Sequence, residues 1–275
     1  MPVKKDGSGK RWVEMELIVP GTPEQVWQAM ATGPGTTAWF TPTTIEERVG
    51  GALRFDMGPN GESRGEVTVW EPPARFGYVE RDWAEGAPPV ATEITVTARS
   101  DGRCVVRMVH SLFSSTDDWD DQMEGFEGGW PAFFKVLRLY LSHFADMKAS
   151  VAFAMAGVEA PQLDVWKRLT EGLGLAGANV GEERTLQAPE TSSGIVEHVE
   201  QDDRQRYILL RLNRPAPGIA LIGTYGIGDT TNVSMTFYHY GDDAGQRAAA
   251  SEPIWRDWLA ETFKRAWATN DAKRI

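Results

Sequence analysis

The stretch TEITVTARSDGRCVVRMVHSL, residues 92–112, contains two alternating runs of residues on either side of Asp101-Gly102. Alternation with a period of two is typical of a β-strand with one buried face. An Asp-Gly pair between two such runs is a strong signal for a tight hairpin. The sequence therefore predicts that Thr92–Arg99 and Arg103–Leu112 form an antiparallel pair.

Shorter strand-like runs precede this hairpin, and Gly- and Pro-rich turns separate them. Turns that recur about every 8–12 residues favour one antiparallel meander. An earlier run around Val13, Met15 and Leu17 alternates in the same way and predicts a first strand. The intervening strands are expected at Ile45–Val49, Leu53–Met57, Gly65–Trp70 and Phe76–Trp83.

Two kinds of helix are expected around this sheet. Thr22, Pro23 and Gln25 form the pattern of a helix N-cap, a first-turn proline and a capping box, so a short helix should begin there. A second short helical segment is expected around Trp39. A long helix is expected over about residues 130–155, because large apolar residues recur there at spacings of three and four: Trp130, Phe133, Phe134, Leu137, Leu141 and Phe144.

The second half of the chain resembles a reduced copy of the first. Residues of the same type recur in the same order and at a nearly constant offset, which is the pattern left by internal duplication. The sequence predicts that Val165-Trp166, Gly194, Tyr207, His239 and Trp255 correspond to Val26-Trp27, Gly65, Tyr78, His110 and Trp130. We therefore expect domains at residues 1–157 and 158–275.

Composition excludes several classes of function. The 275 residues carry a net charge of −11, and no basic stripe marks a nucleic-acid-binding surface. The single cysteine, Cys104, cannot form an intramolecular disulfide. The polar N-terminus lacks the apolar core of a signal peptide, and no uninterrupted apolar run is long enough to cross a membrane. We expect a soluble, cytoplasmic protein with no membrane span.

Five segments in order resemble a known family: PGTPEQVWQAM, AWF, VGG-LRFDMG, GEVTVWEPPARFGY and a GW-FF-L helix. They are similar to the activator of HSP-90 ATPase homologue family, within the START-like (Bet v allergen, SRPBCC) helix-grip superfamily. The resemblance spans residues 12 to about 150. It implies an α+β fold in which a curved antiparallel sheet grips a long C-terminal helix, with a cavity between them, and the second half would be a degenerate copy.

Strand alternation and helix periodicity select the side chains that should face this cavity. Aromatic residues fill many cores, so any one of them is more simply explained by packing. As a group they predict a pocket for a small hydrophobic or aromatic ligand. The expected ligand-binding residues are Phe55, Met57, Phe76, Tyr78, Met108, His110, Trp130, Phe133, Phe134 and Leu137.

His110 is the most prominent polar residue of this set. It could orient a ligand or transfer a proton near neutral pH, although a buried, hydrogen-bonded histidine is the simpler interpretation. The four histidines have no metal-ligand spacing, and no phosphate-binding glycine loop or nucleophile motif is present. The sequence thus predicts no metal, no cofactor and no catalytic residue.

Three functions fit these observations. The first is a binding protein for a small hydrophobic molecule, without catalysis. The second is a cyclase-like enzyme that uses His110 as acid or base. The third is a co-chaperone or regulator with a protein partner or a second copy as homodimer, which would need an exposed apolar patch of several hundred Å².

Overall fold

The computed structural model describes residues 3–58, 61–81, 83, 86–114, 119–227 and 229–271. Side chains are not described for residues 113, 121, 122, 124–128, 227 and 264–271. The chain folds as two compact units, Met1–Met147 and Lys148–Ile275. Each unit has its own antiparallel sheet, so each is described by itself.

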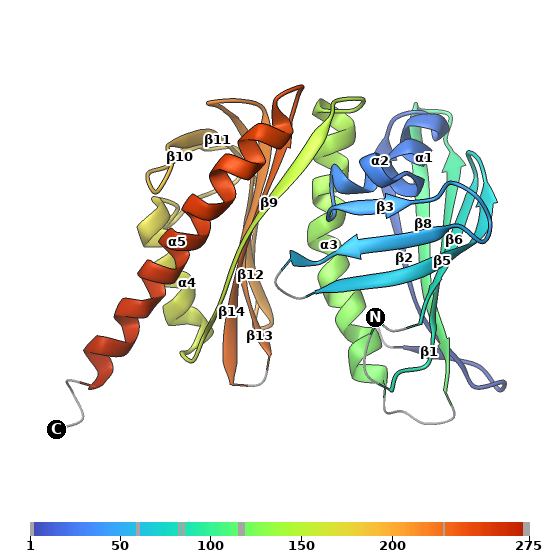
Figure 1. Ribbon diagram of the computed structural model, residues 1–275, viewed down its shortest axis with the longest axis horizontal. Coiled ribbons are helices and arrows are strands. Elements are labelled where there is room, and N and C mark those ends of the chain that lie inside the picture. Colours follow the sequence, from blue (N-terminus) through green and yellow to red (C-terminus); the bar gives the residue numbers. More distant parts are fainter. Residues whose placement is uncertain are drawn as a thin grey trace. The chain divides into compact units, whose positions relative to one another are not determined.

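The first unit contains one eight-stranded antiparallel sheet and three helices (Figure 1). The sheet order is β1-β2-β8-β7-β6-β5-β4-β3. The helices are α1 (Pro23–Ala31), α2 (Gly33–Thr37) and α3 (Asp120–His143). The strands are β1 (Lys4–Lys5), β2 (Lys10–Pro20), β3 (Thr43–Ile45), β4 (Ala52–Asp56), β5 (Glu62–Glu71), β6 (Arg75–Glu80), β7 (Val90–Ala98) and β8 (Arg103–Phe113).

The predicted hairpin at Asp101-Gly102 is confirmed, and it sets the buried face of the sheet. β7 pairs with β8 from Ala98↔Cys104 to Ala91↔Ser111. Alternate residues of both strands are buried, which places one face of the pair in the core. β2 continues this face along the other edge of β8, and α3 packs against β2.

The predicted capping box starts α1. The Thr22 side chain accepts a hydrogen bond from the backbone N–H of Gln25, and the Gln25 side chain accepts one from the backbone N–H of Thr22. The helix then buries Trp27, whose ring meets those of Trp70 and Phe76 edge to face at 5.1 and 6.4 Å. These contacts anchor α1 to β5 and β6.

The second unit repeats this topology with fewer elements. Its six-stranded sheet has the order β10-β11-β12-β13-β14-β9, which corresponds to β4-β5-β6-β7-β8-β2. It lacks counterparts of β1, β3 and α2 among the described residues. Its elements are β9 (Ala149–Val158), α4 (Gln162–Leu173), β10 (Glu183–Leu186), β11 (Ser192–Gln201), β12 (Gln205–Arg214), β13 (Gly218–Ile227), β14 (Thr230–Tyr240) and α5 (Ala244–Asp271). The predicted second, reduced helix-grip unit is confirmed.

A shared irregularity aligns the two sheets residue by residue. β5 has a register shift after Val67, and β11 has one after Val196. A glycine lies two residues before each shift, where the neighbouring strand approaches closely. A Cβ at Gly65 would lie 2.8 Å from the Val79 carbonyl oxygen, and a Cβ at Gly194 would clash with the Arg211 carbonyl oxygen. An origin of the two units by duplication stays a proposal that this agreement supports.

The pairing corrects two of the expected correspondences. Val67 pairs with Tyr78, whereas Val196 pairs with Leu210, so Leu210 and not Tyr207 corresponds to Tyr78. His110 pairs with Val13 on β2, and Phe237 pairs with Ala152 on β9. Val13 and Ala152 lie equally far before α1 and α4. Phe237, and not His239, therefore corresponds to His110.

The long helix and the domain boundary also differ from the prediction. α3 runs over Asp120–His143, not over residues 130–155, and the following segment Ala149–Val158 is strand β9, paired with β14. Small and β-branched residues in this segment suit a strand, but their apolar character also extends a helical stripe. The contact pattern accordingly divides the chain after Met147, ten residues before the expected boundary at 157.

We expect Trp27→Ala to destabilise the first unit by about 3–5 kcal/mol, because it leaves a buried space beside the rings of Trp70 and Phe76. Val49→Ala, at a side chain 61% exposed, is the control and should change stability by less than about 0.5 kcal/mol. Urea denaturation monitored by circular dichroism measures both. A loss below about 1 kcal/mol for Trp27→Ala would contradict this packing.

Candidate functional site

A small internal cavity lies between the sheet and the helices of the first unit. Its volume is about 10 Å³, room for roughly one water molecule. Side chains from α1, α2, α3 and five strands converge on it, together with the segment after α2. The lining residues are Met30, Thr36, Trp39, Phe40, Ile45, Phe55, Phe76, Tyr78, Ile94, Met108 and Trp130.

Half of the ligand-binding residues expected from the sequence line this cavity: Phe55, Phe76, Tyr78, Met108 and Trp130. The others lie around it. Phe133 and Phe134 pack against the rings of Phe40 and Trp39 on the helical side. Leu137 is fully buried farther along α3, and Met57 lies just beyond the end of β4. His110 lies behind Trp130, with the two rings stacked at 5.6 Å.

The sequence interpretation missed six lining residues: Met30, Thr36, Trp39, Phe40, Ile45 and Ile94. Ile94 shares its strand face with the other buried residues of β7, so alternation could have identified it. Trp39 follows α2, and its Nε1–H donates to the Ala29 carbonyl oxygen at 2.8 Å. That hydrogen bond holds the segment after α2 against α1. Such a tertiary contact leaves no periodic pattern in the sequence, so the sequence could not predict it.

An aromatic cover separates the cavity from the surface. It consists of Phe40, Trp130 and Phe133, all of which are partly exposed. The Phe40 ring lies 4.7 Å from Trp130 and 5.0 Å from Phe133, measured between ring centroids. Phe40 and Trp130 also line the cavity. Single side chains therefore extend from the cavity to solvent.

A row of three polar side chains crosses the buried face of the sheet beside the cavity. This polar row consists of Tyr78, Thr92 and His110, which are direct cross-strand neighbours on β6, β7 and β8. Each is at most 3% exposed. The Thr92 Oγ1 and His110 Nδ1 atoms are 2.8 Å apart, within hydrogen-bonding distance, and the Tyr78 hydroxyl also hydrogen-bonds the Thr92 side chain. The row thus begins at the cavity wall and ends against Trp130.

Burial keeps the polar row uncharged at neutral pH. It lowers the pKa of His110 to about 4, and it raises the pKa of Tyr78, with a further contribution from the charge of Glu80. Burial also raises the pKa of the Glu80 carboxyl, which accepts a hydrogen bond from the Ser63 hydroxyl. Loss of hydration disfavours the charged form of each group. His110 is therefore a neutral hydrogen-bonding group, not a cation.

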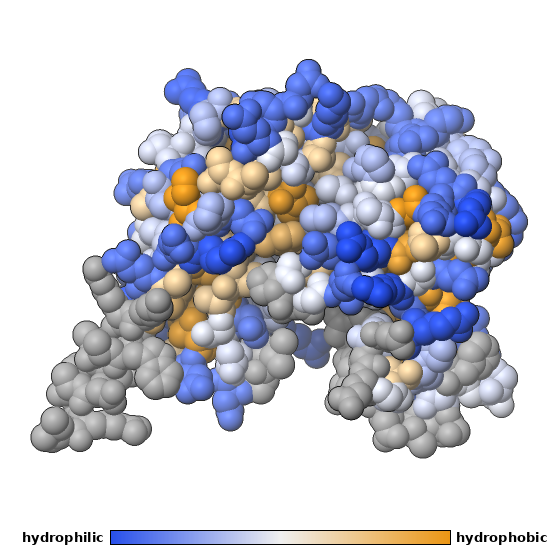
Figure 2. All heavy atoms as spheres, in the orientation of Figure 1, coloured by the Kyte–Doolittle hydropathy of each residue, from blue (hydrophilic) through white to orange (hydrophobic). Residues whose placement is uncertain are grey.

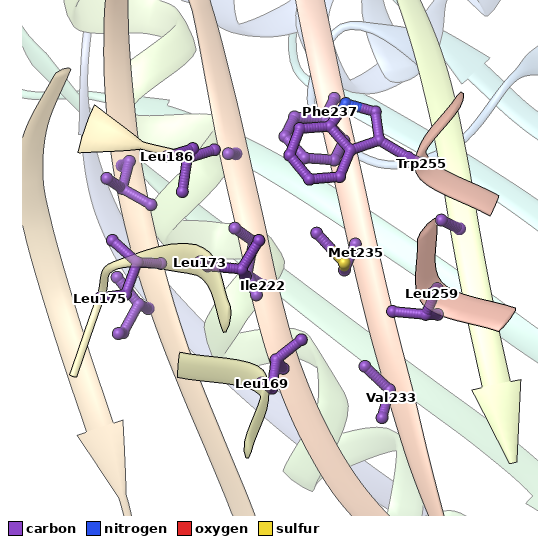
Figure 3. Packing of buried hydrophobic residues seen from close by; sticks show 14 of the residues in the cluster. Leu169, Leu173, Leu175, Leu186, Ile222, Val233, Met235, Phe237, Trp255 and Leu259 are labelled. Atoms are coloured by element: carbon purple, nitrogen blue, oxygen red, sulfur yellow. The ribbon is translucent and has the colours of Figure 1, made fainter. Parts of the chain in front are cut away.

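The second unit fills the same positions with apolar side chains. Leu210, Ala220 and Phe237 are cross-strand neighbours and correspond to Tyr78, Thr92 and His110. Phe237 stacks on Trp255 of α5 at 4.5 Å, as His110 stacks on Trp130. Figure 3 shows this stacked pair above Met235, with Ile222 and Leu259 lower in the view on either side of Met235. The result is a continuous hydrophobic core at the level where the first unit has its cavity.

The described residues offer little for a metal or for a large docking surface. Within the described ranges, no three His, Cys, Asp or Glu side chains gather as a metal site would require. Among the residues whose side chains are described, the large exposed hydrophobic ones lie on different strands, helices and loops: Ile18, Val49, Leu163, Val180 and Ile254. On the face drawn in Figure 2, hydrophobic residues show in several groups between hydrophilic ones. No helix in the described part of the chain is long and apolar enough to span a membrane.

Residues 20–142 match the family model of Activator of Hsp90 ATPase homolog 1-like protein. The resemblance stated from the sequence motifs is thereby confirmed for the first unit. No curated protein has a matching sequence.

Several solved structures are similar at low identity. Protein MLL2253 from Mesorhizobium loti is 23% identical, over 49% of this chain and 98% of its own, with a TM-score of 0.44. The Aha1 dimer from Colwellia psychrerythraea is 21% identical over 48% and 96%, with a TM-score of 0.41. DynU16, from the dynemicin biosynthetic locus, is 16% identical over 95% and 98%, with a TM-score of 0.43.

We expect His110 to make the protein less stable in acid. Its folded-state pKa of about 4 lies below the ordinary value of 6.5, so between these values the unfolded chain binds a proton that the folded chain does not. Stability should therefore fall as pH drops through this window. Because one pKa unit is worth about 1.4 kcal/mol, the loss should reach about 3 kcal/mol.

His110→Phe places at this position the phenylalanine that the second unit has as Phe237. The substitution should remove the acid-dependent loss of stability that His110 causes. Denaturation of wild type and variant at pH 7 and at pH 4 measures how much stability each protein loses in acid. His239, whose pKa is lowered in the same way, contributes equally to both proteins, so its contribution cancels in the difference. Parallel stability profiles for the two proteins would show that His110 titrates normally.

Proposed function

We propose that the first unit, whose residues 20–142 match the activator family, binds one small aromatic or otherwise apolar molecule between its sheet and α3. The observation that carries this proposal is the contrast between the two units. One sheet-and-helix frame holds a continuous aliphatic and aromatic core in the second unit. In the first unit the same frame holds a cavity, a row of polar groups and an aromatic cover.

The volume of about 10 Å³ sets a condition on binding. A ring system cannot enter unless cover side chains move. Phe40 and Trp130 are suited to this, because each reaches from the cavity to solvent and contacts other rings by their faces or edges. Rotation exchanges these contacts for contacts with the ligand. The proposed site is therefore one that opens when the ligand binds.

The affinity expected of such a site is moderate. Removing apolar surface from water contributes about 25 cal/mol per Å². Two effects oppose this gain in binding free energy: the ligand loses translational and rotational freedom, and the displaced rings become partly exposed. A micromolar dissociation constant is the reasonable expectation for a two-ring molecule, about −8 kcal/mol.

The two other functions have weaker support. A cyclase-like reaction would need His110 within reach of a substrate proton. Here His110 is 3% exposed, stacked behind Trp130 and absent from the cavity lining. A co-chaperone or dimer would need a continuous apolar surface, whereas the large exposed hydrophobic residues are scattered over separate elements.

A matched pair of substitutions tests the binding site. Met108 and Met235 occupy corresponding positions on β8 and β14, and both are buried. We expect Met108→Trp and Met235→Trp each to destabilise their unit by about 1–3 kcal/mol through overpacking. Only Met108→Trp should abolish saturable one-to-one binding of an uncharged fluorophore such as N-phenyl-1-naphthylamine, titrated under conditions where both variants are folded. Equal binding by the two variants, or no binding by wild type, would refute the proposed function.

A further inference from the structure

The fold itself does not require the polar row. The second unit has the same strand order, the same register shift and the same helix stacking, yet Leu210, Ala220 and Phe237 replace all three polar side chains. A fourth position follows the same pattern. Gly65 pairs with Glu80, and its counterpart Gly194 pairs with Leu212. Buried polar groups contribute little to stability even when hydrogen-bonded, and they are costly when they are not. Their presence at these corresponding positions in the first unit only therefore points to a ligand.

The surroundings exclude a charged ligand group. None of the described residues that line the cavity carries a charge. A charge buried there would lose its hydration without gaining a counter-charge, which is strongly unfavourable. The Glu80 carboxyl is close enough for its negative charge to act on Tyr78 in the cavity wall. An anion would meet this additional repulsion.

The chemistry of the polar row suits a neutral hydrogen-bonding group. A tyrosine hydroxyl, a threonine hydroxyl and a neutral imidazole can each donate and accept a hydrogen bond. The row can therefore run in either direction, from Tyr78 to His110 or the reverse. In one direction Tyr78 offers a lone pair to the cavity, and in the other it offers its proton. It can thus serve a ligand hydroxyl or a ligand carbonyl.

From this arrangement we infer that the ligand of the first unit is an uncharged aromatic molecule with a hydroxyl or carbonyl group, which hydrogen-bonds Tyr78 at the end of the row Tyr78–Thr92–His110. The inference rests on the proposed function and names the ligand class for that same site. The apolar rings would occupy the space beside Phe55 and Met108 that rotation of Phe40 and Trp130 opens, and the polar group would select the orientation.

Three probes of equal ring size test the inference: naphthalene, 2-naphthol and 2-naphthoate, titrated by calorimetry at pH 7. One added hydrogen bond in a buried site should make 2-naphthol bind about tenfold more tightly than naphthalene. The carboxylate of 2-naphthoate should bind at least tenfold more weakly than naphthalene. Tyr78→Phe should abolish the preference for 2-naphthol and leave naphthalene binding within about threefold. Tyr238→Phe, which alters a buried tyrosine of the second unit, is the control and should change nothing.

The outcomes separate the two claims. Equal affinity for naphthalene and 2-naphthol in wild type, or a preference that survives in Tyr78→Phe, overturns the inference and leaves the proposed function intact. Tight binding of 2-naphthoate also overturns it. Failure of every probe to bind overturns the proposed function together with it. Should Tyr78→Phe not fold, Thr92→Val interrupts the same row, and the 2-naphthol preference should fall at least threefold.

Discussion

The space between a curved antiparallel sheet and one long helix must be filled, and this requirement shapes both units. Because side chains alternate along a strand, every second residue of each strand points toward the helix. Protein interiors tolerate few voids between such packed layers. The second unit meets the requirement with aliphatic residues and the Phe237–Trp255 stack (Figure 3). The first meets it with partly exposed aromatic rings and a hydrogen-bonded row, which leave a small cavity. The six strands that the units share have the same order, and the first unit adds β3 and α2, which also line its cavity.

A buried histidine is ordinarily explained by its hydrogen bond, and His110 has one with Thr92. The second unit shows that phenylalanine serves the same stacking role against tryptophan at that position. The polar row is consequently not a demand of the helix-grip frame. The proposed hydrogen bond to a neutral group of an aromatic ligand would explain why the row is polar.

Local signals in the sequence were sufficient for much of the fold. The Asp101-Gly102 hairpin and the Thr22 capping box depend on neighbouring residues, and both are confirmed. Half of the candidate lining residues were identified because alternation fixes which side chains share a face. The position of Trp39, the end of α3 and the pairing of β9 with β14 depend on contacts between distant segments. Residue offsets also misaligned His239 with His110, because loops of unequal length shift the register between the copies.

The most direct test is a crystal structure of the full chain with 2-naphthol at saturating concentration. The account predicts the ligand between the sheet and α3 of the first unit, its oxygen within about 3 Å of the Tyr78 hydroxyl. The side chains of Phe40 and Trp130 should be rotated away from their present contacts, and the core around Phe237 should be unchanged. A ligand bound only at the surface or inside the second unit, or a first-unit core that stays closed at saturation, would contradict it.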